Sequence, residues 1–320
     1  MTETIKNRSE ILFLYDVTDA NPNGDPVDEN KPRIDEETGR NIVTDVRLKR
    51  TIRDYLHEQK GKEVFIREIR KEDGNLKTKE DRLNDFGNES ITEKCIDIRL
   101  FGATTAVEGK TITLTGPVQF KFGRSLHKVD MVYIKGTTVM PSRADKKQGT
   151  FTEKYILSYS LIAFYGIANE NAAKSQQIPL TDADINLMLE GMWNGSKNLI
   201  SGSKFGQMPR MLMQVIYREG QNFHIGELDK LISMTSDKTH EAIRDIAEVK
   251  IDITNLTKAL NDNKDKIEKI RCMVDGRVKF VKEVIEVKEG KEEIKIQDIH
   301  DIKTALNGLT VEDLVFKTED

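Results

Sequence analysis

Cysteine and long apolar runs are scarce in this chain, and each absence excludes a class of protein. Only two cysteines occur in 320 residues, and Cys95 and Cys272 are too few and too isolated for a disulfide framework or a zinc site. No apolar run approaches the roughly 20 residues that a membrane-spanning helix needs. The N-terminal residues also lack the apolar core of a signal peptide. The sequence therefore predicts a cytoplasmic protein without membrane contact.

Catalytic and metal-binding motifs are equally scarce. The five histidines show no metal-ligand spacing, and neither a G-x-S-x-G motif nor a Cys/His signature occurs. Gly109-Lys110-Thr111 is similar to the end of a nucleotide-binding P-loop, but Thr104 stands where that motif requires glycine. We therefore expect no cofactor, no metal site and no enzymatic activity.

Acidic residues around the first long loop leave one enzymatic alternative open. Clustered carboxylates can hold Mg²⁺, and the aspartates around this loop are Asp16, Asp19, Asp25 and Asp28. Turns also favour aspartate and asparagine, so turn chemistry explains the same residues. The alternative function is a metal-dependent ribonuclease that uses Asp16 or Asp25.

Charge is distributed unevenly along the chain. The net charge is −4, and 32% of the residues are charged against 37% that are hydrophobic. Residues 226–320 carry a net charge of −5, whereas residues 110–150 hold eight Lys and Arg against two Asp. Residues 191–218 hold four basic residues and no acidic one. Because phosphate binding depends on local potential, such a chain can bind a polyanion despite its negative total.

Residues 44–56 predict an amphipathic helix that carries several cations. Thr44 suits the N-cap position, and Asp45 suits the positive end of the helix dipole. The apolar residues recur at spacings of three and four, at Leu48, Ile52, Tyr55 and Leu56. The cations cluster on another side: Lys49, Arg50 and Arg53, with Arg47 at the margin. Because neighbouring cations repel one another, this face is either solvated or covered by an anionic partner.

The remaining apolar segments predict an α+β fold. Their order is strand, helix, strand, arm, strand, helix, strand, which is the order of a modified ferredoxin-like fold with insertions, similar to RNA-recognition (RRM-like) domains. The strands are expected at residues 10–17, 111–122, 155–168 and 208–217, and the second helix begins at Thr181. The insertions are a charged segment at 57–95 and a basic hairpin arm at 123–150. The tail adds a helix at about 255–269 and a hairpin over 278–296.

Two more basic patches flank the predicted sheet. The arm region contributes cations and one histidine: Lys121, Arg124, His127, Lys128, Lys135, Arg143, Lys146 and Lys147. The loop at 202–207 places Lys204 beside Phe205. Glycines let a backbone approach phosphates closely, and an aromatic ring can stack on a base. Three such patches favour a polyanion-binding protein, and a protein scaffold that binds acidic partners is a further alternative.

Ordered segments of the chain resemble one known family. The first set is Ile11–Val17, Asn21–Pro26, Pro32–Asp35, Thr38–Gly39 and Val43–Arg50. The second set is Arg99–Gly102, Thr115–Phe120, Ser125–His127 and residues 151–169. Together they resemble the Cas7 family, the RAMP-superfamily backbone subunits of CRISPR Cascade complexes, in the branch of type I-B and I-C systems. The resemblance runs through about Tyr217, roughly two thirds of the chain.

The resemblance implies a hand-shaped, non-catalytic subunit of a type I-B-like antiviral complex. Copies stack into a filament along the spacer of the CRISPR guide RNA, beside other Cascade subunits. They hold the guide ready to pair with target DNA, so base pairing reads sequence while the protein reads backbone. Residues 1–225 would form the palm, with a finger-like insertion at 57–95 and a thumb at 123–150, and the acidic residues 226–320 would pack on it.

The resemblance also implies which residues contact the guide. In the palm, Lys49 and Arg53 would bind phosphates with Arg50 close by, and the loop residues Asn21 and Asn23 join them. At the thumb the expected contacts are Lys121, Arg124, His127, Met140, Arg143 and Lys147, with Met140 as an apolar wedge. Lys204, Phe205 and Gln207 would line the guide groove.

Overall fold

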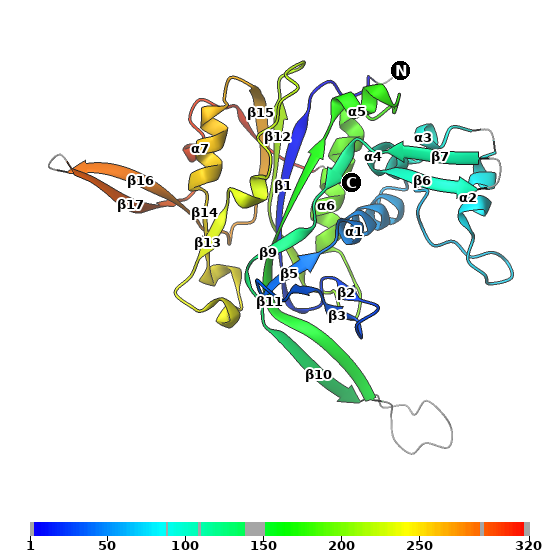
Figure 1. Cartoon of the computed structure of the whole chain (residues 1–320), viewed down its shortest axis with the longest axis horizontal. Coiled ribbons are helices and arrows are strands. Elements are labelled where there is room, and N and C mark those ends of the chain that lie inside the picture. The colour runs from blue at the N-terminus through cyan, green and yellow to red at the C-terminus, as the bar shows by residue number, and fades with distance from the viewer. Residues whose placement is uncertain (1–2, 88, 108–109, 138–150, 289–290, 317–320) are drawn as a thin grey trace.

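The computed structural model describes residues 3–87, 89–107, 110–137, 151–288 and 291–316. A large, mostly antiparallel sheet occupies its centre, with the main strand order β18-β15-β12-β1-β11-β9-β5-β4. Helices cover one face of the sheet and C-terminal residues cover the other, while three hairpins project outward (Figure 1). Within the described residues, no helix is long and apolar enough to cross a membrane.

The strands of the central sheet come from all parts of the chain. Along its path they are β18 (Val311–Asp313), β15 (Ile267–Val274), β12 (Gln207–Tyr217), β1 (Ser9–Ala20), β11 (Phe151–Ala168), β9 (Gly123–Lys128), β5 (Arg40–Val43) and β4 (Ile34–Asp35). β8 (Val118–Phe120) and β10 (Met131–Thr137) also pair with β11. β1 lies between β11 and β12 and is antiparallel to both. The predicted strands at 10–17, 155–168 and 208–217 are therefore confirmed.

The side chains on the two faces of β1 belong to two separate hydrophobic cores. Phe13, Tyr15 and Val17 belong to the core beneath the helices, which are α1 (Asp45–Glu58), α5 (Glu170–Ser175) and α6 (Asp182–Lys197). Leu12 and Leu14 belong to the core beneath the C-terminal residues. Successive side chains of a strand point to opposite faces, so a strand buried on both sides reads as a continuous apolar run. This accounts for the unbroken hydrophobic stretch in β1.

Helix α1 forms where the sequence predicts it. The Thr44 hydroxyl accepts a hydrogen bond from the Arg47 amide, and Asn23 Oδ1 accepts from the Thr44 amide at 2.9 Å. The helix packs closely on α6, where a Cβ at Gly195 would lie 3.0 Å from the Tyr55 Cβ. Glycine at this position therefore lets the two helices approach.

The arm has other boundaries than the sequence predicts. β9 is a strand of the central sheet, bonded to β5 and β11. The projecting hairpin is β10 with the first half of β11, paired from Met131–Leu157 to Thr137–Phe151 (Figure 1). The strand expected at 111–122 is also wrong as one unit. It divides at Gly116–Pro117 into β7 (Lys110–Thr115), which pairs with β6 (Gly102–Val107), and β8 in the central sheet.

The segment at 57–95 folds into a small lobe beside α1. It contains α2 (Lys79–Phe86) and α3 (Ile91–Lys94), followed by α4 (Ile96–Phe101). A separate minor core of Phe65, Leu83, Cys95 and Ile98 holds it together. Two short strands, β2 (Gly24–Asp25) and β3 (Lys31–Pro32), pair in the first long loop.

The C-terminal residues build the cover of the second face. Their elements are η1 (Leu228–Lys230), β13 (Ser233–Thr235), η2 (His240–Ala242), η3 (Ile246–Glu248), β14 (Lys250–Asp252), α7 (Thr254–Asp262), β16 (Phe280–Lys288), β17 (Lys291–Ile299) and η4 (Ile302–Ala305). The predicted hairpin over 278–296 is confirmed as β16 and β17. The helix predicted to reach residue 269 is wrong, because it ends at Asp262 and Ile267 begins β15 beside β12.

Candidate nucleic-acid interface

Three segments meet beside the N-terminal end of α1. They are the loop after β1, the first turns of α1 and the loop at residues 199–206 before β12. The Asn21 amide donates to the Ser203 carbonyl at 2.7 Å, which joins the two loops. Gln207 faces Val17 in the β1–β12 ladder. The sequence-predicted residues Asn21, Asn23, Lys204, Phe205 and Gln207 are thus brought together.

Arg47 and Lys204 are the cations of this meeting point. Neither has a carboxylate within ion-pair distance among the residues that the structure describes. Burial lowers the pKa of Lys204, and the nearby charge of Arg47 lowers it further. Burial also lowers the pKa of Arg47. The protein therefore holds two partly buried cations close together without an ion pair, and only the more distant charge of Asp54 offsets Arg47 in part. An anion bound between them would stabilise both.

Polar atoms at the same place lack partners within the described structure. Arg47 Nε and Gln207 Nε2 are buried donors without an acceptor, and Asn21 Oδ1 is a buried acceptor without a donor. Buried polar groups are almost always hydrogen-bonded, so each such atom calls for an explanation. Two donors and one acceptor suit a ribose-phosphate, whose phosphate oxygens accept and whose 2′-hydroxyl donates.

Phe205 adds an exposed aromatic ring. Its side chain is 72% exposed, in the same loop as Lys204. An exposed ring beside a cation is the usual arrangement for stacking a base while a phosphate is held nearby. Asn23 has another task, because its Oδ1 accepts from both the Thr44 amide and the Thr44 hydroxyl and so holds the start of α1.

The cationic face predicted on α1 is not an open one. Lys49 and Arg53 are only 9% and 7% exposed. Lys49 Nζ lies 2.8 Å from Asp45, and Arg53 Nε lies 2.9 Å from Asp97. Asp97, itself fully buried, also accepts from the backbone amide of Phe65 at 2.8 Å. In this structure neither Lys49 nor Arg53 presents free charge, since both are internal and paired, and their expected guide contact stays a prediction.

Arg50 is exposed but also paired. Its Nε lies 2.7 Å from Asp54, one turn further along the helix. The spacing of four residues in Asp45–Lys49 and Arg50–Asp54 is a signal in the sequence for both pairs. The Arg53–Asp97 pair joins residues that are 44 positions apart, so no local pattern announces it.

The predicted residues on β9 and beside it lie on another part of the sheet. His127 is 1% exposed and stacks on Tyr159, and burial lowers its pKa to about 4. His127 is therefore not accessible to a guide in this structure, and the contact expected of it stays a prediction. Lys121 lies 3.0 Å from Glu227, and Arg124 lies 2.9 Å from Asp35. Met140, Arg143 and Lys147 lie outside the described residues.

The aspartates of the first loop have structural partners. Asp16 is 2% exposed, accepts from the Tyr159 hydroxyl at 2.9 Å and pairs with Arg210 at 2.9 Å. Asp25 accepts from the Val27 amide and lies 3.5 Å from Arg33. In the described part of the chain, no three His, Cys, Asp or Glu side chains converge in a way that could hold a metal ion.

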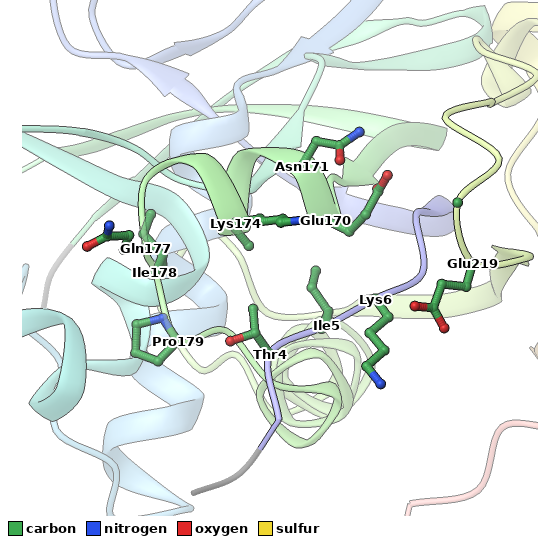
Figure 2. A pocket seen from close by; sticks show the side chains of 12 residues that line it. Thr4, Ile5, Lys6, Glu170, Asn171, Lys174, Gln177, Ile178, Pro179 and Glu219 are labelled. Carbon is green, nitrogen blue, oxygen red and sulfur yellow. The ribbon is translucent and has the colours of Figure 1, made fainter.

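A cavity of about 620 Å³ opens elsewhere, between the N-terminal segment and α5 (Figure 2). Lys6 and Lys174 line it together with Glu170 and Glu219. None of the residues predicted from the sequence lines this cavity. Its mixed charge gives no preference for an anion, so it adds nothing to the interface at Arg47.

Comparison with known proteins decides the family. A family model described as CRISPR-associated protein Cas7 matches residues 7–254. The chain belongs to the Cas7 family. A CRISPR-associated protein Cas7 from Haloferax volcanii is 33% identical over 312 residues, which cover 87% of this chain and 89% of that protein.

Solved structures share the fold of this Cas7-family chain. A chain of a "CRISPR RNA-guided surveillance complex" aligns with a TM-score of 0.50 and 16% identity, over 83% of this chain and 88% of that one. A chain of a "CRISPR RNA-guided surveillance complex, pre-nicking" aligns with a TM-score of 0.52 and 12% identity, over 83% and 92% of the two chains. At these identities the likeness establishes the mixed α+β fold and no residue role.

Proposed function

We propose that this Cas7-family chain is a non-catalytic, guide-RNA-binding backbone subunit of a type I-B-like Cascade complex. Copies would lie along the spacer of the guide beside other Cascade subunits and present it for pairing with target DNA in the cytoplasm. Family membership supports the assembly, and the Arg47 interface supports RNA as the ligand. Backbone contacts of this kind position a strand without reading its sequence.

We also infer a ferredoxin-like palm. The order β12-β1-β11-β9, with α1 and α6 on one face, is consistent with the split βαβ arrangement. In this view the β10–β11 hairpin is the thumb, the lobe at 57–95 is a finger and residues 226–320 form an extension of the palm. Two strands of that extension, β15 and β18, continue the palm sheet itself.

One observation carries the RNA assignment. Arg47 and Lys204 are partly buried cations without a carboxylate partner in the described structure, beside the unsatisfied Asn21 Oδ1 and the exposed Phe205 ring. Phosphate, ribose and base each find a suitable group there. The ribonuclease alternative has less support, because burial and ion pairing occupy Asp16 and turn contacts occupy Asp25.

The test compares two double variants of the full chain. Arg47→Ala/Lys204→Ala removes the interface cations, whereas Lys258→Ala/Lys264→Ala removes two exposed cations at α7 and serves as the control. After purification, the wild type and the control should carry nucleic acid, seen as a high 260/280 nm absorbance ratio that falls after ribonuclease treatment. The interface variant should carry much less. Equal retention by both variants would refute the interface.

Catalysis is tested on the bound RNA. We expect the RNA to stay intact when the complex is incubated with Mg²⁺ or Mn²⁺. Regular fragments that disappear in Asp16→Asn or Asp25→Asn would overturn the non-catalytic assignment and favour the ribonuclease.

A further inference from the structure

A second group of cations lies at the β5–β9 edge of the sheet. Arg40 of β5 and Lys128 of β9 are direct partners in the antiparallel ladder. Like charges directly opposite each other on neighbouring strands are destabilising. Both side chains are exposed, and among the described residues neither has a carboxylate within 4 Å. On its other side Arg40 faces Asp35 of β4 in the ladder, but that carboxylate lies 2.9 Å from Arg124. The fold therefore keeps Arg40 and Lys128 in register without an ion pair of their own in the described structure.

These two cations border a hollow. A cavity of about 390 Å³ is lined by Thr38, Arg40, Arg124, Lys128 and His240. A neighbouring cavity of about 300 Å³ shares Arg40 and Arg124 and adds Lys230 and Ser233. Because the two cavities share Arg40 and Arg124, they lie side by side between the sheet edge and the C-terminal cover. We call the two together the edge groove.

The acids near the edge groove already have other partners. Asp35 lies 2.9 Å from Arg124, and the partly buried Asp229, which itself lines the second cavity, lies 3.9 Å from Lys121. Glu227 lies 2.7 Å from Lys230. These contacts neutralise Arg124 and Lys230 in part and leave Arg40 and Lys128 as the excess charge. The groove is therefore positive at the end where Thr38 and His240 add further polar groups.

The edge groove and the Arg47 interface lie on opposite faces of the sheet. Leu126, Ala163 and Ile232, which line the groove, belong to the core beneath the C-terminal cover or pack against it. Arg47 is on α1, which packs on the other face through Leu48 and Ile52. In Figure 1, β5 and β9 run between α1 on one side and the yellow C-terminal elements on the other.

We propose that the edge groove binds the phosphodiester backbone of a nucleic-acid strand, as a second contact separate from the Arg47 interface. Cations at intervals along an open groove match a chain of phosphates better than a single enclosed anion. The strand is either the guide curling around the sheet edge or a second strand paired with it. The chemistry is the same in both cases, and the proposal goes beyond the guide site proposed above.

The variant Arg40→Gln/Lys128→Gln removes both charges and keeps polar, though shorter, side chains. The full chain, freed of nucleic acid, is titrated with fluorescein-labelled 20-nucleotide single-stranded RNA at several NaCl concentrations. In a second arm, protein saturated with unlabelled RNA is titrated with the labelled complementary DNA. Lys258→Ala/Lys264→Ala is the control for net charge.

If the two cations contact phosphates, the variant should bind more weakly than the wild type. The slope of log K against log[salt] should also be shallower for the variant by up to about 1.4. A loss in the RNA arm assigns the groove to the guide, and a loss confined to the DNA arm assigns it to the second strand. Results equal to the control in both arms would overturn the proposal. A third arm titrates the protein with labelled poly-glutamate. If the variant loses affinity for poly-glutamate but not for RNA or DNA, the proposal is also overturned, since the groove would then bind acidic protein.

The two proposals fail separately. Arg47→Ala/Lys204→Ala is measured in parallel, and independent sites should give additive losses because they lie on opposite faces of the sheet and share no ion-pair partner. If only the Arg47 variant loses nucleic-acid affinity, the edge-groove proposal is refuted and the guide-site proposal stands. Loss in the edge-groove variant alone does the reverse.

Discussion

Arg47 and Arg53 stand six positions apart on one helix and have opposite situations. Arg53 is buried against Asp97, whose carboxylate also accepts hydrogen bonds from the backbone amides of Phe65 and Ile66 in the lobe at 57–95. Arg47 is partly buried without a carboxylate partner in the described chain, and its Nε has no acceptor. The same residue type therefore joins two parts of the fold in one case and, in the proposed guide site, offers charge to a ligand in the other. Pairing, more than the number of cations, distinguishes the two roles.

The largest effect should come from the paired side of this comparison. Asp97→Ala leaves Arg53 buried without a counter-charge and removes the acceptor of the Phe65 and Ile66 amides. We expect the free energy of unfolding to fall by about 3–5 kcal/mol, measured by urea denaturation. Adding Arg53→Met should recover part of the loss. A cost no larger than that of Asp54→Ala would contradict the structural role of the pair.

A second buried group should make stability depend on pH. His127 Nε2 accepts from the Leu161 amide at 3.2 Å, which requires the neutral ring, and burial lowers its pKa to about 4. The unfolded chain takes up the proton below its ordinary pKa of about 6.5 while the folded protein does not. The contribution of neutral His127 to the free energy of unfolding is thus fully present above pH 6.5. It decreases by up to about 3 kcal/mol as the pH falls to 4.

Urea midpoints at pH 7, 6, 5 and 4 measure this loss. His127→Gln, although less stable at pH 7, should lose less between pH 6.5 and 4 than the wild type. Parallel pH profiles for the two proteins would mean that other groups govern the dependence.

The unpaired side of the comparison should affect binding and leave folding intact. Arg47→Ala/Lys204→Ala should lower RNA affinity about tenfold, or about 1.4 kcal/mol, with a salt slope shallower by about 1.4. Its stability should equal or exceed that of the wild type, because two partly buried cations are removed. Fluorescence anisotropy and urea denaturation of the same samples measure both. A stability loss matching the loss of binding would place Arg47 with Arg53 as a structural residue.

The smallest effect should come from the exposed pair. Arg50→Ala breaks a surface ion pair with Asp54, half-exposed on the arginine side. Such helix pairs contribute about 0.3–0.5 kcal/mol, and we expect no change in RNA affinity. A tenfold loss of affinity in Arg50→Ala would extend the interface from Arg47 along the helix.

Local pattern was sufficient where one segment decides its own structure. The N-cap at Thr44, the two-sided burial of β1 and the β16–β17 hairpin follow from spacing and turn residues within short windows. The ordered motifs also placed the chain in its family, which the family model confirms. The boundaries of the arm failed because β9, though as basic as its neighbours, pairs with β5 and β11 across the sheet.

The sequence by itself determined α1, α6 and the central strands β1, β11 and β12, and which segments carry charge. Only the tertiary structure decided which charges are free. Asp97 neutralises Arg53 from 44 positions away, and Arg40 meets Lys128 only because β5 and β9 pair. The helix predicted to continue beyond Asp262 ends there, and the following residues form β15 because they pair with β12. The physical reason is common to all three: periodicity records the contacts within an element, whereas ion pairs and ladders join elements that are distant in the chain.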